Sequence, residues 1–205
     1  LRAGFREFVD QLFLVQKVKL EKGLLLQGQQ LPPQQFQDLV TLGLQLHKLS
    51  WVRQFITDYH PLLPSGDRID QLIYQTARVD QAEGELEKAT DALTVHNFKL
   101  SDLATKAALL HFQLLYQTER LPQLSEELDN WRLRWMRSPE LNTAERQSLL
   151  NCISVLKQIL RLRKQSEKLS EDELQTKQGK LMDRIQNLSH LSLERWLSHI
   201  LQHLI

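Results

Sequence analysis

The stretch that decides the fold is residues 73–93, which reads IYQTARVDQAEGELEKATDAL. Its apolar and small residues recur at three- and four-residue steps, which is the spacing of one face of an α-helix. Gly84 lies near the middle and suits a turn, because glycine tolerates backbone conformations that other residues avoid. Ala77 and Ala89 lack bulk where two paired helices approach closely. The stretch therefore predicts two antiparallel helices joined at Gly84.

A similar pattern recurs on both sides of this stretch at a period of about 34 residues, the length of a tetratricopeptide repeat. One helix pair cannot bury both of its apolar faces, whereas stacked pairs share a continuous core. We therefore expect an all-α fold, specifically a tetratricopeptide-like α-solenoid of antiparallel helix hairpins with capping C-terminal helices. The matching positions are Leu39, Leu42, Gly43, Leu46, Phe55 and Tyr59 before the stretch, and Phe112, Leu115, Leu121, Leu124 and Leu128 after it.

The expected solenoid is a single helical-repeat domain over residues 1–205. Its repeats lie at about 36–67, 70–103 and 105–138, and capping helices over 142–205 cover the exposed end of the array. The alternative is a Leu-rich helical bundle whose matches at this period are coincidental. The small residues at close-packed positions favour the repeat, because random placement of leucine would not produce them.

The composition also favours helices. Glycine and proline number 7 and 6 among 205 residues, so residues that form turns are scarce. Pro32 and Pro33 suit a first helical turn, and Ser170 with Glu173 matches a capping box. Ten helices result: a first one ending near Gly23, then 33–48, a short helix capped by Ser50, 68–82, 85–95, 100–117, 121–135, 142–164, 171–187 and 192–203.

The net charge and the cysteine content indicate which binding partners and which cellular compartment to expect. The formal net charge is +1, so no overall field attracts nucleic acid or anionic lipid. The single cysteine, Cys152, fits a reducing compartment, and no apolar run reaches the length of a membrane span. We therefore expect a cytoplasmic protein without a membrane partner. Since the chain begins with Leu1 rather than Met, we also expect a missing N-terminal region.

Several runs of the sequence are similar to a known family. They are residues 39–44 (LVTLGL), Trp51-Val52, Phe55-Ile56, Tyr59, Leu63-Pro64, Ala77, Gly84, Tyr116, Leu121, Lys180-Leu181, Ile185 and Trp196-Leu197. Over about residues 5–204 the chain resembles an uncharacterised tetratricopeptide-like helical-repeat protein family of Bacteroidetes. It departs from the family at Glu119, where a turn glycine is usual, and at Asp80, where an aromatic residue is usual. The resemblance implies a helical-repeat fold and a bacterial source, and it implies no known reaction.

The reactive side chains do not form a catalytic motif in the sequence. His199 and His203 are spaced to face one metal ion, but no third ligand accompanies them, which favours a solvated or capping role. Cys152 lies in an apolar stripe, which favours a buried and inert thiol. Phosphate-binding loops and nucleophile elbows are also absent from the sequence. We therefore expect no enzyme, no metal site and no cofactor.

Two basic segments raise the question of nucleic-acid binding. Indole and guanidinium planes can stack on bases, but tryptophans one turn apart can equally enter a core while arginines between them face water. The second interpretation is favoured, so nucleic acid is an unlikely partner. The segments are Trp131, Arg132, Arg134, Trp135 and Arg137, and the run Lys157, Arg161, Arg163 and Lys164.

The first helix of each tetratricopeptide pair lines a concave groove, where side chains are free to bind. Amide, guanidinium and phenol groups there can hydrogen-bond the backbone of an extended peptide. We therefore expect a protein-protein interaction scaffold that binds a partner protein or peptide. The predicted contact residues are Gln71, Tyr74, Arg78 and Gln81 in the second repeat, and Lys106, Gln113 and Tyr116 in the third.

Alternatives to this function remain open on the sequence. One is a structural or self-assembling segment that supports the missing N-terminal region, and another is a nucleic-acid-binding helical repeat. The chain's own helices are also possible occupants of the groove, since Val40 and Leu44 in the first repeat are apolar. The oligomeric state does not follow from the sequence.

Overall fold

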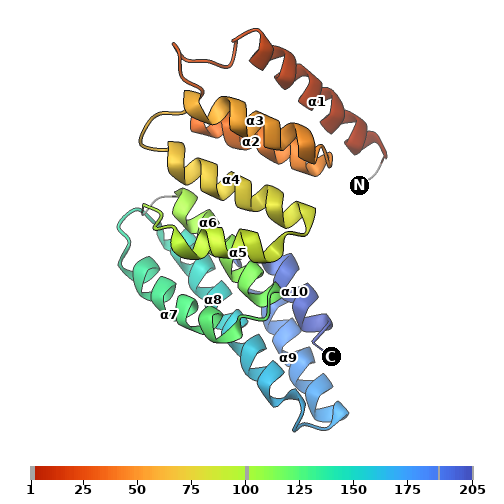
Figure 1. Cartoon of the computed structure of the whole chain (residues 1–205). Helices are drawn as coiled ribbons and strands as arrows, with labels where there is room; N and C mark the ends of the chain where they lie inside the picture. The colour runs from red at the N-terminus through yellow and green to blue at the C-terminus, as the bar shows by residue number, and fades with distance from the viewer. Residues whose placement is uncertain (1–2, 100–101, 189, 205) are drawn as a thin grey trace. The chain divides into compact units, whose positions relative to one another are not determined.

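The computed structural model describes residues 3–99, 102–188 and 190–204, and within these ranges it is all-helical, with no strand (Figure 1). A short 3-10 helix, η1, follows the third α-helix. The elements are α1 (Ala3–Glu21), α2 (Pro33–Gln45), α3 (Leu49–Tyr59), η1 (His60–Leu62), α4 (Arg68–Glu83), α5 (Leu86–Val95), α6 (Asp102–Gln117), α7 (Leu121–Arg137), α8 (Thr143–Ser166), α9 (Glu171–Asn187) and α10 (Glu194–Gln202).

The all-α prediction is confirmed, and the helices begin and end within a few residues of their expected bounds. Gly84 ends α4 in the left-handed conformation, at φ 86°. Ser170 and Glu173 form the predicted capping box, with each side chain bonded to the other residue's backbone N–H. The predicted cap at Ser50 is wrong, because α3 begins at Leu49 and Lys48 precedes it without a side-chain cap.

The described helices group into two compact units, residues 1–118 and 119–205. We call them unit 1 and unit 2 and describe each by itself. The division falls between α6 and α7, inside the expected third repeat at 105–138. Glu119, in the turn between α6 and α7, adopts a positive φ of 58°. The expected single repeat domain stays a prediction.

In unit 1, each helix packs against the next one, and α4 also packs against both α2 and α6. Gly43 lets α2 approach α3 closely, since an added Cβ would lie 2.3 Å from Val52 Cγ2. Phe36 and Phe55 join these helices, with ring centroids 5.0 Å apart. Two apolar clusters fill the unit, one centred on α2 and α3 and the other between α4, α5 and α6. Burial of these faces holds the helices in register.

In unit 2, α8 packs against α7, α9 and α10, and α9 also packs against α10. The apolar face of α8 is buried along its length, which explains why this helix contacts the other three. Asn142 and Glu145 form a second capping box at the start of α8. Trp135 is fully buried on α7, and the helix ends at Arg137, just before Ser138 and Pro139.

Candidate binding face on helices α2, α4 and α6

Helices α2, α4 and α6 of unit 1 share one polar side. They are not consecutive in the chain, yet hydrogen bonds between side chains join α4 to α2, α6 to α2, and α4 to α6. These bonds span sequence separations of 37, 69 and 36 residues. We name this surface the polar face, and it consists of Gln37, Thr41, Arg78, Gln81, Lys106, Gln113 and Gln117, with the buried amides of Gln71 and Gln75 beneath it.

Arg78 lies at the centre of the polar face and is half-buried. Its Nη1 and Nη2 each donate to Thr41 Oγ1 at 3.2 Å, and Nη1 also donates to Gln75 Oε1 at 2.9 Å. The guanidinium carbon lies 5.7 Å from the Tyr74 ring centroid. Burial lowers the pKa of the Arg78 guanidinium from its ordinary value, because desolvation disfavours the charged form. The guanidinium has more N–H donors than these acceptors use, so it can still donate to a ligand.

Lys106 and Gln81 connect α6 to the other two helices. Lys106 Nζ donates to Gln37 Oε1 at 3.1 Å and lies 2.6 Å from Asp102 Oδ2. Gln81 Nε2 donates to Gln117 Oε1 at 3.4 Å, which is a long hydrogen bond. The side chains at both ends of the face are half-buried or exposed and so remain accessible to solvent.

The structure places all seven predicted contact residues on α4 and α6 but corrects the exposure of two. Gln71 is 2% exposed and accepts a hydrogen bond from Gln75 Nε2 at 3.1 Å. Tyr74 is 9% exposed and packs in the apolar cluster between α4, α5 and α6. This burial raises the pKa of the Tyr74 hydroxyl. Gln71 and Tyr74 therefore pack beneath the polar face and do not face solvent.

The other five predicted residues are half-buried: Arg78, Gln81, Lys106, Gln113 and Tyr116. Gln113 lies one turn before Gln117 on α6, and its amide makes no hydrogen bond within the described residues. An amide in this position can donate and accept at once, as a peptide group requires.

Sequence reasoning missed the contribution of α2 to this face. It assigned Val40 and Leu44 to the groove, whereas Val40 is fully buried in the cluster around α2 and α3. Gln37 and Thr41 point to the polar face instead, as their bonds to Lys106 and Arg78 show. Their spacing of one helical turn was the available signal.

An ion-pair network around the buried carboxylate of Asp80 lies on the opposite side of α4. Asp80 is 1% exposed, and its Oδ1 lies 2.7 Å from Arg53 Nη2 on α3 and 3.0 Å from Lys88 Nζ on α5. Arg53 also pairs with Glu83. The hydrogen bonds that Arg53 donates to Glu83, and then the one to Asp80, raise the pKa of Arg53 above its ordinary value. These ion pairs connect α4 to α3 and α5. They therefore limit rotation of α4 about its axis and keep its polar residues on the polar face.

The other reactive residues considered in the sequence are Cys152, His199 and His203. Cys152 is fully buried, and desolvation raises its pKa to about 12, which makes its thiolate scarce at neutral pH. His199 and His203 are exposed, with ring centroids 4.5 Å apart. No group of three or more potential metal-binding side chains occurs among the residues that the structure describes.

The aromatic and basic segment of α7 follows the interpretation that the sequence favoured. Trp131 and Trp135 are 7% and 0% exposed, so their rings are not available to stack on bases. Arg132, Arg134 and Arg137 are exposed, and the Arg134 guanidinium lies 5.1 Å from the Trp131 ring centroid. In the other basic run, Lys157 pairs with Asp129, and Arg163 pairs with Glu119.

Comparisons with protein-family models, curated proteins and solved structures find no match for this chain. Across the described ranges, every helix is too short or too polar to cross a membrane.

Proposed function

We propose that the helices of unit 1 form a tetratricopeptide-like stack and that the polar face binds an extended segment of a partner protein. The chain then acts as a protein-protein interaction scaffold. The observation that carries the proposal is the meeting of amide and cationic side chains from α2, α4 and α6 on one side. In stacked helix hairpins, the first helices of successive pairs line the binding side. In the proposed stack, α2 and α4 are the first helices of the pairs α2–α3 and α4–α5, and α6 packs against α4.

The chemistry of the face matches a peptide backbone. Side-chain amides present a donor and an acceptor at once, which is the pattern of a peptide group. Gln113 has no hydrogen-bond partner within the described residues, and the Gln81 amide makes only a long bond to Gln117. Both amides can therefore hydrogen-bond a ligand while giving up little or no hydrogen bonding within the chain.

The charges of the face favour an acidic segment. Arg78 and Lys106 are its cations, and Asp102 is the carboxylate nearest to Lys106. A partially buried guanidinium with unused donors binds a carboxylate more strongly than an exposed lysine does, because the surroundings screen the charge less. We therefore expect the bound segment to carry Asp or Glu, or its terminal carboxylate, near Arg78.

The test is a selection from a library of displayed, unstructured peptides with the full chain as bait. The affinity of a selected peptide is then measured by fluorescence anisotropy. The double variant Gln81→Ala, Gln113→Ala is expected to weaken binding about tenfold, as loss of two interfacial hydrogen bonds predicts. The matched control, Gln11→Ala with Gln54→Ala, removes two exposed amides on α1 and α3 and is expected to leave the affinity unchanged. Equal weakening in both variants, or no selected peptide, would contradict the proposal.

A further inference from the structure

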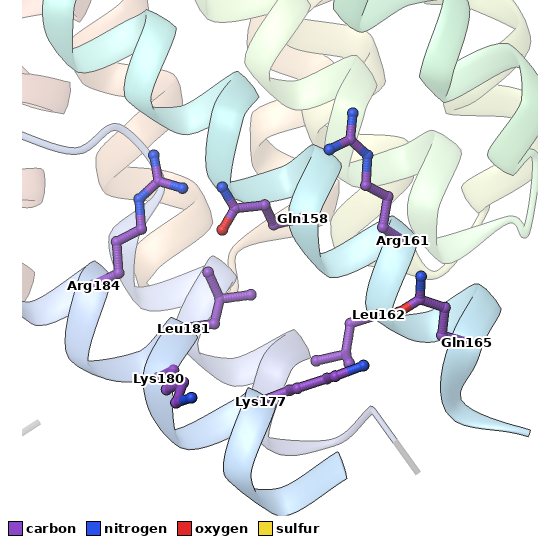
Figure 2. Close-up of a pocket in the computed structure, with 8 residues that line it drawn as sticks. All are labelled: Gln158, Arg161, Leu162, Gln165, Lys177, Lys180, Leu181 and Arg184. Carbon is purple, nitrogen blue, oxygen red and sulfur yellow. The ribbon is translucent and has the colours of Figure 1, made fainter. Parts of the chain in front are cut away.

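A basic pocket lies between α8 and α9 in unit 2, with a volume of about 310 Å³ (Figure 2). Four residues of each helix line it, and on each helix they follow the spacing i, i+3, i+4, i+7, which marks one helical face. The pocket consists of Gln158, Arg161, Leu162 and Gln165 from α8, and Lys177, Lys180, Leu181 and Arg184 from α9.

The charge of the basic pocket is one-sided. Four of its eight residues are cationic, and none is acidic. Arg161, Lys177 and Lys180 make no ion pair or side-chain hydrogen bond within the described residues. Arg184 is half-buried, and its Nη2 donates to Ser154 Oγ at 2.9 Å, which orients the guanidinium without neutralising it. Four positive charges therefore line the pocket, and no carboxylate is among its lining residues.

Two other cations of α8 are paired with carboxylates, unlike those of the basic pocket. Lys157 and Arg163 have the carboxylates of Asp129 and Glu119 as partners. These two cations line a separate cavity between α7 and α8, of about 710 Å³, together with Asp129. On α9, the carboxylate of Glu173 lies one turn before Lys177 and attracts it, although it is bonded to the Ser170 backbone N–H in the capping box. The cations of the basic pocket thus have less compensation from carboxylates than Lys157 and Arg163 have.

The floor of the pocket strengthens its attraction for anions. Leu162 and Leu181 are buried between the two helices, and Figure 2 shows them among the polar and charged side chains. Apolar walls lower the local dielectric, so charges near them interact more strongly than on an open surface. Arginine presents a planar fork of donors that fits phosphate, and lysine adds a mobile point charge.

We propose that the basic pocket binds a small phosphorylated molecule, with a diphosphate group held by Arg161, Lys177, Lys180 and Arg184. Its volume lies at the lower end of ligand sites, which run from about 300 to 1,000 Å³. That volume suits a compact polyanion rather than a folded partner. Gln158 and Gln165 supply amide groups for the remainder of the ligand. The proposal stands on unit 2 alone and is independent of the peptide-binding function of unit 1.

The test is a calorimetric titration of the full chain with sodium pyrophosphate at fixed ionic strength. Saturable binding is expected for the natural chain. The double variant Lys177→Gln, Lys180→Gln is expected to weaken it about tenfold or more, because both residues are exposed cations of the pocket. The matched control Lys19→Gln, Lys22→Gln removes two exposed lysines of unit 1 with the same spacing and the same change in net charge. It is expected to bind as the natural chain does.

Two further arms make the result decisive. The variant Lys177→Arg, Lys180→Arg keeps the charge and is expected to retain binding, which separates loss of charge from loss of fold. Absence of saturable binding to the natural chain, or equal weakening in the control, overturns the proposal. A single-stranded oligonucleotide that binds more tightly than pyrophosphate, and loses affinity in the same glutamine variant, also overturns it in favour of a nucleic-acid backbone.

Discussion

At the residue scale, the least expected feature is a buried carboxylate in the middle of unit 1. Asp80 is 1% exposed, and a lone buried charge is costly. The structure compensates it with Arg53 and Lys88 from two neighbouring helices. Such a network favours one packing of α4 against α3 and α5, because each hydrogen-bonded ion pair requires a particular geometry between its two groups.

The Asp80 network predicts unequal effects of its members on stability. Asp80→Asn removes the shared charge and is expected to cost about 1.5–3 kcal/mol, the range for a hydrogen bond to a charged group. Lys88→Gln is the control and is expected to cost about 0–1 kcal/mol, because the Lys88 side chain is 60% exposed. Amide hydrogen exchange over α3 to α5 measures both. Equal protection in the two variants would contradict the account of Asp80.

At the element scale, helix existence was predictable, whereas particular ends and contacts were not. Apolar spacing located the ten α-helices found among the described residues, because that signal is local. The capping box at Ser170 was also found, since Glu173 lies at the required distance in sequence. Ser50 shows the limit of such reasoning, because a serine before an apolar face is equally compatible with a place inside the first turn.

Two glycines within helices predict opposite responses to a methyl group. At Gly43, an added Cβ would collide with Val52, so Gly43→Ala is expected to destabilise by about 1–3 kcal/mol despite the better helix propensity of alanine. At Gly179 in α9, the position of the Cβ is open, so Gly179→Ala is expected to stabilise by about 0.5–1 kcal/mol. Thermal unfolding followed by circular dichroism compares them. A higher melting temperature for Gly43→Ala would show that α2 and α3 do not approach as described.

Two serines near helix starts provide a second matched pair. Ser170→Ala is expected to cost about 1 kcal/mol and to speed exchange of the Glu173 amide, whereas Ser50→Ala is expected to be neutral. The hydrogen bond from the Ser170 backbone N–H lowers the pKa of Glu173 below its ordinary value of 4.5. That bond therefore stabilises α9 above about pH 4.5 and is lost as the pH falls through the lowered pKa. A larger effect at Ser50 than at Ser170 would contradict these assignments.

At the scale of the whole molecule, the sequence predicted the helical class and the side of α4 and α6 that carries polar groups. It did not predict the burial of Gln71 and Tyr74, because burial depends on contacts with α5 and α6 that periodicity within α4 does not reveal. The basic pocket was also missed, since its two halves lie on separate helices. The spacing of Lys177, Lys180 and Arg184 was the signal for one half.

The division into two units has the same origin. The segment between α6 and α7, where unit 1 meets unit 2 in the sequence, is not rich in proline or glycine. The boundary between the units is therefore not visible in the composition. α6 ends at Gln117 and α7 begins at Leu121, so only a short turn separates the two helices where the units divide. Contacts between distant residues decide where compact units begin, and a single sequence records them only indirectly.

The central claim is that the polar face of α2, α4 and α6 binds a peptide, and side-chain amide signals in a ¹H–¹⁵N NMR spectrum test it most directly. With a selected peptide added to the full chain, the account predicts that the amide signals of Gln81 and Gln113 shift with the occupancy of the site. Those of Gln11 and Gln54 are predicted to stay in place. Binding with unmoved Gln81 and Gln113 signals would contradict the claim, because the peptide would then lie elsewhere.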